Sequence, residues 1–294
     1  MAALLTGLHH VTALAGDPIR NNAFYTGVLG MRLVKRTVNF DDPLTYHLYF
    51  GDEVGSPGSL VTHFPHSNAK RGVHGSPEIL ETLLAIPSGT TDEWQKRLES
   101  EGVAAARGER GDGPRLAFED HDGMRFGLVE RSDVPSGGGI TRVAGAVIHT
   151  PEVDALGACL TDVLGFEPMA GQAAGYRVGD GSFVEIVEAE ADGRTSMGAG
   201  TVHHVAWRVP DDATQAEVGE RLRSAGIATT PVMDRQYFRS IYCRVPGGVI
   251  FEIATDGPGF TVDESKATLG EALKLPPQYE RRREEIENHL LPLR

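Results

Sequence analysis

The stretch TVHHVAWRVP, residues 201–210, has a near-copy close to the start of the chain, GLHHVTALAG at residues 7–16. Each copy places a His-His pair before a short apolar run, and both runs have the composition typical of a β-strand. Similar segments at a large separation are the sequence signature of a fold built from repeated units. The two stretches therefore predict two equivalent first strands in a repeated architecture.

Two further pairs of similar segments interleave along the chain. AFYTGVLGMRLV (23–34) resembles ACLTDVLGFEPM (158–169), and QKRLESEGVAA (95–105) resembles GERLRSAGIAT (219–229). Each segment indicates a helix that ends at a glycine, which suits the left-handed position after the last turn, followed by a strand. Runs typical of strands, bounded by turn signals, stand before and after these helices. The pattern predicts an α+β fold of about four βαβββ modules.

The predicted modules fall into two pairs. Residues 1–136 are expected to form an N-terminal pair of βαβββ modules, and residues 140–258 a C-terminal pair, with the glycine-rich segment SGGG between them. Residues 259–294 are expected to form a C-terminal tail with a helix. The chain is thus predicted to divide at a flexible, glycine-rich boundary.

The helix of the tail is predicted to start after Pro277 and to carry apolar residues on one side: Ile286, Leu290 and Leu291. We expect it to pack on the outside of a sheet. The alternative is a contact between two copies of the chain in a homodimer.

Composition limits the class of partner. The 28 Lys and Arg residues against 41 Asp and Glu give a net charge of −13, which argues against nucleic acid or an anionic membrane surface as a partner. The segment MAALLTGLHH lacks the features of a signal peptide, and no run approaches the roughly 18–20 apolar residues of a membrane span. Cys159 and Cys243 have no metal-type spacing and are expected to be reduced and buried. These features predict a cytoplasmic protein.

Side chains on a strand alternate between faces, so the two members of a His-His pair should not both point into one cavity. His10 and His204 are each followed by Val and are predicted to be equivalent, with Ala146 at that position in the third module. Aligning VPGGVIFE with SPGSLVTH by their turns puts Glu252 level with His63. Two histidines and one carboxylate thus come to equivalent strand ends.

Glu252 lies in the apolar run VIFEIA, where a buried carboxylate is costly unless it is paired, hydrogen-bonded or bound to a metal. If the preceding hairpin turns at Gly247, Tyr242 faces Glu252 from the neighbouring strand. Two histidines and one carboxylate form a ligand set that suits a non-haem Fe(II) centre with open coordination positions. His10, His204 and Glu252 are therefore candidate metal ligands, with ordinary structural roles as the alternative.

The segments GLHHVTA, FYTGVLGM, VHHVAWRVP and VPGGVIFE together resemble the vicinal oxygen chelate superfamily, whose members are built from paired βαβββ modules. The runs YHLYFGDEVGSPG and YFRSIYCRVPGG favour its ring-cleaving dioxygenases, particularly the glyoxalase-like ones that act on hydroquinones. The likeness covers residues 6–256, and the tail segment LPPQYE is also of the kind seen in such proteins. It implies mixed, curved sheets around a metal site at which the first and last modules meet.

The resemblance also implies roles for individual residues. Fe(II), or Mn(II) as in some relatives, is expected to be held by His10, His204 and Glu252. Tyr242 is implied as an active-site acid or hydrogen-bond donor. Supporting roles near the metal or the substrate are implied for four further residues: His9, Thr12, His203 and Arg235.

The function implied by the resemblance is ring cleavage of an aromatic diol, such as a hydroquinone or a catechol, with O2 as the second substrate. Three protein ligands leave about three octahedral positions on iron for the diol and O2. One alternative is a glyoxalase-type isomerase or lyase that uses a divalent metal without O2, and another is a metal-free small-molecule binding protein of the same fold. His63 as a fourth ligand would favour the isomerase; a polar substrate contact and a structural role are its other interpretations.

Overall fold

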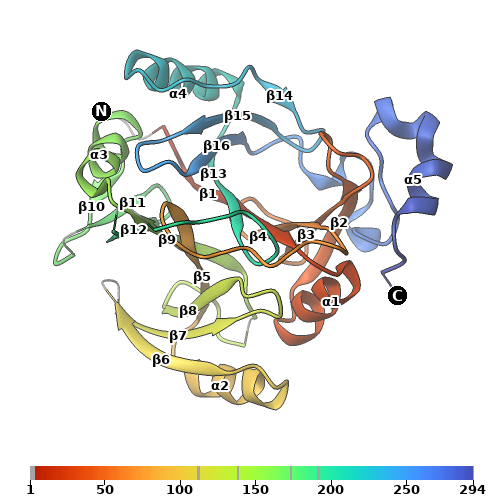
Figure 1. The fold of residues 1–294 in the computed structure, drawn as a ribbon, viewed down its shortest axis with the longest axis horizontal. Coiled ribbons are helices and arrows are strands. Elements are labelled where there is room, and N and C mark those ends of the chain that lie inside the picture. The colour runs from red at the N-terminus through yellow and green to blue at the C-terminus, as the bar shows by residue number, and fades with distance from the viewer. Residues whose placement is uncertain (1–3, 111–112, 138, 173, 191–192, 294) are drawn as a thin grey trace.

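The computed structural model describes residues 4–110, 113–137, 139–172, 174–190 and 193–293. The described chain forms four successive βαβββ modules and a tail, so the predicted α+β fold is confirmed. Figure 1 shows the modules as two sheets, with helices on the outside of each.

The modules share one order of elements. Module 1 comprises β1 (Gly7–Ala15), α1 (Pro18–Ala23), the π-helical turn η1 (Phe24–Val28), β2 (Arg32–Val38), β3 (Tyr46–Gly51) and β4 (Leu60–Pro65). Module 2 comprises β5 (Glu78–Pro87), α2 (Thr91–Ser100), β6 (Ala105–Arg110), β7 (Gly113–Glu119) and β8 (Arg125–Arg131). Module 3 comprises β9 (Arg142–Thr150), α3 (Val153–Ala158), the π-helical turn η2 (Cys159–Val163), β10 (Glu167–Pro168), β11 (Gly175–Val178) and β12 (Ser182–Glu188). Module 4 comprises β13 (Val202–Val209), α4 (Asp212–Ser224), β14 (Met233–Asp234), β15 (Arg239–Arg244) and β16 (Ile250–Thr255).

The interleaved repeats of the sequence correspond to a structural difference between modules. The helices of modules 1 and 3 run on into a π-helical turn, whereas those of modules 2 and 4 do not. Gly30 and Gly165 follow the two π-helical turns with φ of 70° and 77°, the left-handed conformation that glycine adopts without strain. Modules 1 and 3 are thus closer copies of each other than of their neighbours.

Each sheet combines one module from each half of the sequence. The first sheet has the order β14-β15-β16-β13-β1-β4-β3-β2 and joins modules 4 and 1, while the second, β10-β11-β12-β9-β5-β8-β7-β6, joins modules 3 and 2. The joints are antiparallel pairs of first strands, β1 with β13 and β5 with β9. The first and last modules therefore meet side by side, and the two His-His stretches lie on neighbouring strands.

The two faces of the first sheet have different contents. Trp207, Ile241 and Phe251 belong to the main core together with Val218 and Leu222 of α4, so the helix covers this face. The opposite face carries a second, smaller cluster and the buried polar groups described below. Strand alternation thus separates a helix-packed core face from a face available for chemistry.

The predicted equivalence of His63 and Glu252 is wrong by one residue. Thr12, two residues after His10, pairs with Thr62, whereas Ala206, two residues after His204, pairs with Glu252. Thr62 is therefore the counterpart of Glu252. The error comes from the turn. In the last hairpin, one more residue lies between the Pro-Gly pair and this position than in the first module, and an alignment without gaps cannot detect that difference.

The second sheet repeats the central register of the first. In each sheet three paired residues form a row across three adjacent strands. The row crosses β1, β13 and β16 in the first sheet, and β5, β9 and β12 in the second. The corresponding rows are His10–Ala206–Glu252 in the first sheet and Glu81–Val147–Glu185 in the second.

This register also corrects the residue of the third module that is equivalent to His204. Gly145, two residues before Val147, occupies the position equivalent to His204, so the prediction of Ala146 is wrong by one residue. Ala146 belongs to the main core, on the face opposite Val147. No imidazole can therefore extend from this position in the second sheet.

The second sheet fills its central row with an ion pair. Arg115 of β7 donates from Nη1 to Glu81 Oε2 and from Nη2 to Glu185 Oε2, each at 2.8 Å. Its side chain is 2% exposed. A guanidinium is a suitable partner for two carboxylates because its N–H groups point in fixed directions.

The tail runs along the outside of the first sheet, where Figure 1 shows α5 (Arg283–His289) beyond β2. Before it lie three 3-10 turns: η3 (Phe260–Val262), η4 (Lys266–Thr268) and η5 (Pro277–Arg282). The α-helix of the tail thus begins at Arg283 and not directly after Pro277, and Ile286 and Leu290 are buried. Leu291 is 42% exposed, so its predicted position on the buried side is wrong; its carbonyl oxygen instead accepts a hydrogen bond from Tyr46.

Cys159 and Cys243 are free and buried, as predicted. Burial raises the pKa of Cys159 to about 11, which keeps its thiol protonated. Among the described residues, no helix is both long enough and apolar enough to cross a membrane.

Candidate metal centre

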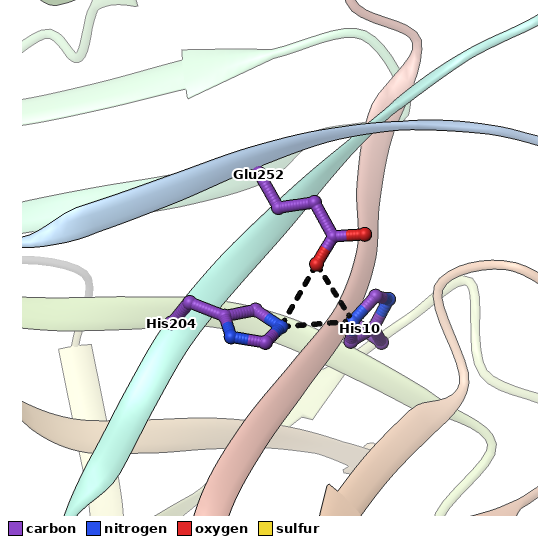
Figure 2. Close-up of side chains that lie close together, drawn as sticks. All are labelled: His10, His204 and Glu252. Carbon is purple, nitrogen blue, oxygen red and sulfur yellow. Dashed lines mark hydrogen bonds and ion pairs between the residues drawn. The ribbon is translucent and has the colours of Figure 1, made fainter. Parts of the chain in front are cut away.

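Three side chains from three neighbouring strands converge on the open face of the first sheet. Figure 2 shows His10 from β1, His204 from β13 and Glu252 from β16 pointing toward one another. The two Nε2 atoms lie 3.2 Å apart, and Glu252 Oε2 lies 2.9 Å from His204 Nε2 and 3.4 Å from His10 Nε2. All three residues are buried. The central pairing of β1 with β13 is what brings the distant histidines together.

The electrostatics of the cluster favour an ionised Glu252 carboxylate beside a neutral His204 imidazole. Burial alone would raise the pKa of Glu252, but the nearby His10 and His204 outweigh it and hold that pKa well below its usual value. Burial lowers the pKa of His204, which Glu252 partly offsets. Neutral imidazole nitrogens and an ionised carboxylate are the forms that bind divalent metals.

An unsatisfied oxygen provides a test of whether these residues fit a metal ion. Glu252 Oε1 accepts a hydrogen bond from Ser240 Oγ, whereas the buried Oε2 has no well-aligned donor among the described residues. One donor atom from each of the three side chains lies within 4.8 Å of the others. A buried carboxylate oxygen facing two Nε2 atoms fits a divalent cation, which would satisfy all three atoms at once.

The neighbouring histidines orient the candidate ligands. His9 Nδ1 lies 2.8 Å from His10 Nδ1, and His203 Nδ1 lies 2.7 Å from His204 Nδ1. Burial and the neighbouring imidazole lower the pKa of His203 to about 4, and the same two causes lower that of His9. If each inner imidazole donates from Nδ1 to its neighbour, its Nε2 lone pair faces the cluster.

A cavity of about 260 Å³ opens beside the three candidate ligands. Its apolar lining consists of Leu14, Phe40, Phe64 and Phe238. Its polar lining includes Asn39, Asp41, His47, His203, Arg235 and Tyr242. Flat apolar side chains with a few polar groups on one side are typical of a pocket for a small aromatic molecule.

Tyr242 and Arg235 stand together at the side of this cavity. Tyr242 pairs with Glu252 across β15 and β16, so the predicted hairpin register is confirmed. Arg235 Nε donates to the Tyr242 hydroxyl oxygen at 3.2 Å. Burial and Glu252 raise the pKa of Tyr242, so the phenol keeps its proton at neutral pH and can donate it in a hydrogen bond.

The family model described as Glyoxalase/Bleomycin resistance protein/Dioxygenase superfamily matches residues 7–128 and 142–253. The chain belongs to this superfamily. The predicted resemblance is therefore confirmed, and the two matched segments correspond to modules 1 and 2 and to modules 3 and 4.

Relatives with full-length similarity in the superfamily are named as dioxygenases. A protein of Bacillus subtilis (strain 168) named "Putative ring-cleaving dioxygenase MhqO" is 43% identical over 99% of this chain and 98% of its own. The chlorohydroquinone/hydroquinone 1,2-dioxygenase of Sphingobium indicum is 32% identical, over 95% of this chain and 94% of its own. These relatives support the predicted enzyme class, a ring-cleaving dioxygenase.

Solved structures agree with this assignment. A crystal structure of a Bacillus subtilis protein described as a "putative dioxygenase" has a TM-score of 0.93 and 42% identity, over 99% of this chain and 98% of that one. Glyoxalase I from Zea mays has a TM-score of 0.64 at 15% identity, over 85% of this chain and 92% of that one. At this identity the maize enzyme shares the superfamily fold alone.

Not every residue implied by the superfamily resemblance lies at the cavity. His203 lines it together with His204, so strict strand alternation was wrong for this pair; the two rings lie edge to face with centroids 5.0 Å apart. His9 is buried behind His10 and packs on Phe238 with ring centroids 4.9 Å apart. Thr12 is also buried, and its Oγ1 lies 2.8 Å from Thr62 Oγ1.

His63 lies on the other face of β4, away from the candidate ligands. Its ring packs against Tyr25 with centroids 4.3 Å apart, and neither ring nitrogen has a hydrogen-bond partner among the described residues. The interpretations of His63 as a fourth ligand or as a substrate contact are therefore wrong. The one-residue shift in the β4 register explains the error.

His47 and Asp41 are among the cavity residues to which the sequence assigned no role. His47 is half-buried, with Nε2 2.9 Å from Thr62 Oγ1 and Nδ1 2.9 Å from the Tyr49 hydroxyl. Its alternation with Tyr49 in TYHLYF is a signal that could have put both on the cavity face. Asp41 lies in a loop, where no periodicity indicates which side chain turns inward.

Proposed function

We propose that this superfamily member is a non-haem Fe(II)-dependent ring-cleaving dioxygenase acting on an aromatic diol such as a hydroquinone or a catechol. The observation that carries the proposal is the convergence of His10, His204 and Glu252 beside a cavity with aromatic walls. The full-length similarity to proteins named as ring-cleaving dioxygenases supports the reaction class.

His10, His204 and Glu252 would hold the iron through two Nε2 atoms and Glu252 Oε2. Bound there, Fe(II) would supply Lewis acidity toward a diol hydroxyl and a site for O2. Mn(II) suits the same donors. Ser240 keeps the second Glu252 oxygen occupied by a hydrogen bond, so one carboxylate oxygen alone faces the imidazoles.

The cavity walls would hold the aromatic ring. Phe40, Phe64 and Phe238 offer apolar surface that excludes water from the ring and fixes its plane. Tyr242 accepts a hydrogen bond from Arg235, which leaves its own proton for a substrate oxygen. Because its pKa is raised, Tyr242 would act as a hydrogen-bond donor and acid toward negative charge developing on the substrate.

His203 is suited to donate a hydrogen bond to an oxygen of the diol. Its pKa of about 4 keeps the imidazole neutral at pH 7. Nδ1 is engaged with His204, whereas Nε2 has no hydrogen-bond partner among the described residues. Because its Nδ1 accepts from His204, this half-buried neutral imidazole carries its proton on Nε2 and can donate it in a hydrogen bond to a diol oxygen in the cavity.

The test loads the purified protein with Fe(II) under nitrogen and then supplies O2 with a panel of hydroquinones and catechols. We expect oxygen uptake that depends on both iron and diol, and loss of bound iron in a His204→Ala variant. Absence of uptake with every diol would refute the proposal. Turnover without O2 would favour the isomerase or lyase instead, and a protein that binds no metal would favour the metal-free binding module.

A further inference from the structure

The cavity mouth is bridged by an ion pair between the first and last modules. Arg235 Nη2 donates to Asp41 Oδ2 at 3.1 Å. The Arg235 side chain is 15% exposed and that of Asp41 is 63% exposed, so the arginine faces inward and the carboxylate covers it from the solvent side. The same guanidinium donates from Nε to Tyr242.

The loop that carries Asp41 is fixed by hydrogen bonds. The Asp41 amide donates to Asn39 Oδ1 at 2.9 Å, and the Asn39 amide donates to the Thr45 carbonyl oxygen at 2.8 Å. From the tail, the Tyr279 hydroxyl donates to the Phe40 carbonyl oxygen at 2.7 Å. Asp41 is therefore held at the mouth by contacts on both sides of it.

Charge around the cavity is balanced before a substrate binds. Among the described residues, Arg235 is the one Lys or Arg side chain that lines the cavity. Asp41 already neutralises it, and Glu252 belongs to the candidate metal ligands. The other titratable side chains of the lining are imidazoles and phenols, so the described lining offers no second guanidinium and no ammonium group for a ligand anion.

This balance has a consequence for substrates with an ionised substituent. A carboxylate on the ring would need a cation, but next to Arg235 it would also lie beside the Asp41 carboxylate, and like charges at close range repel. An uncharged ring substituent meets no such repulsion and can pack against Phe40, Phe64 or Phe238.

We propose that Asp41 is a specificity-determining residue that makes the cavity accept uncharged aromatic diols and reject carboxylated ones. The inference rests on the proposed function for its substrate class. It assigns Arg235 to hold Tyr242 rather than to bind a substrate anion. A cavity with an unpaired Arg235 would have the reverse preference.

The experiment compares matched ligand pairs that differ in one substituent: methylhydroquinone with gentisate, and methylcatechol with protocatechuate. Binding to the Fe(II)-loaded full-length protein is measured calorimetrically under nitrogen, so the readout does not depend on turnover. We expect the unmodified protein to prefer the methyl compound of the pair it binds. Asp41→Asn should shift the ratio of the two dissociation constants about tenfold toward the carboxylated ligand, because one repulsive charge is removed.

Two further variants separate a local effect from a general one. Asp42→Asn removes the same charge from the same loop at a residue that does not line the cavity, and it should change the ratio less than about twofold because Arg235 donates to Asp41, whereas the Asp42 carboxylate accepts from Thr45. In an Arg235→Gln background, Asp41→Asn should shift the ratio less than it does alone, since the repulsive charge is removed but no guanidinium is left to bind the ligand carboxylate.

The result that overturns the inference is equal binding of both members of a pair by the unmodified protein, or a ratio that Asp41→Asn leaves unchanged. Binding of none of the four ligands would overturn it too. Failure of the proposed function gives a different result: no diol-dependent O2 uptake even though the Asp41-dependent ratio is observed.

Discussion

At the centre of the first sheet, the row His10–Ala206–Glu252 crosses three adjacent strands; at the centre of the second, Glu81–Val147–Glu185 crosses the three equivalent strands. The backbone register is the same in both. In the first sheet two imidazoles face the carboxylate, and Glu252 Oε2 has no aligned donor in the part of the chain that the structure describes. In the second, the Arg115 guanidinium donates to both carboxylates.

The two sheets differ in how they supply a counter-charge to a buried carboxylate. A carboxylate buried at the middle of a sheet needs a counter-charge. The second sheet supplies it from the chain through Arg115, and its inner residues need nothing from solution. In the first sheet no arginine among the described residues donates to Glu252, and the donor set fits a cation taken from solution. Repeated modules can therefore keep one backbone while only one copy is suited to chemistry.

The largest expected effect comes from removing the carboxylate of the first row. Glu252→Gln should lose most of the bound metal and lower kcat/KM for diol cleavage on the order of a thousandfold, because a neutral amide is a poor metal ligand. Metal content and oxygen uptake measure the two effects. Glu185→Gln is the matched control in the second row and should keep its metal. Equal metal content in both variants would contradict the comparison.

Disrupting the second row should lower the free energy of unfolding and leave the metal content unchanged. Arg115→Met removes the cation that Glu81 and Glu185 share, and removing one partner of a buried ion pair costs about 3–5 kcal/mol of unfolding free energy. Urea denaturation of the metal-loaded protein measures this. Adding Glu81→Gln and Glu185→Gln to Arg115→Met should recover part of the loss, since no buried charges are left. A fall in metal content comparable to that of Glu252→Gln would contradict the assignment.

Much of this architecture could be predicted from residues alone. The helix segments that end at Gly30 and Gly165 revealed the repeated modules, and the hairpin centred on Gly247 gave the pairing of Tyr242 with Glu252. These features are local, because a glycine in the left-handed region or a short hairpin determines its own neighbourhood. That module 1 pairs with module 4 was implied by the family resemblance, since no local pattern encodes it.

The errors came from turns and loops. A single additional residue in the last hairpin put Thr62, rather than His63, at the position equivalent to Glu252. A shift of one residue moves every side chain to the other face, so the alignment of short motifs cannot settle such a register. Asp41 went unnoticed because its inward contact with Arg235 depends on the tertiary position of a loop.

The register of β4 predicts a pH effect on stability. His63 packs in the core with a pKa lowered to about 3 by burial and by His121, whereas in the unfolded chain it is about 6.5. Between these values the unfolded state binds the proton that the folded state excludes, so stability falls as the pH falls. From pH 7 to pH 5 this one group should cost about 2 kcal/mol.

His63→Phe keeps an aromatic ring and removes the titration. Between pH 7 and pH 5 the variant should therefore lose about 2 kcal/mol less unfolding free energy than the unmodified protein. Urea denaturation of both proteins at the two pH values measures the two changes in unfolding free energy. His9, His203 and His204 contribute equally to both changes, so their contributions cancel when one is subtracted from the other. Parallel losses in both proteins would mean that His63 is not held neutral on the core face.

The smallest expected effect separates two tyrosines at equivalent positions in modules 1 and 4. Tyr49 pairs with Thr62 as Tyr242 pairs with Glu252. The Tyr49 hydroxyl is hydrogen-bonded to His47 Nδ1, whereas Tyr242 accepts from Arg235 and keeps its proton for a ligand in the cavity.

Tyr242→Phe should lower kcat for diol cleavage about tenfold or more with unchanged metal content, as expected for loss of a positioned acid or donor. Tyr49→Phe should change kcat by less than about twofold, because a bond within the protein does not strengthen in the transition state. Equal losses of kcat would mean that the two modules share the catalytic work, and the functional asymmetry of the first sheet would then lie in its metal ligands alone.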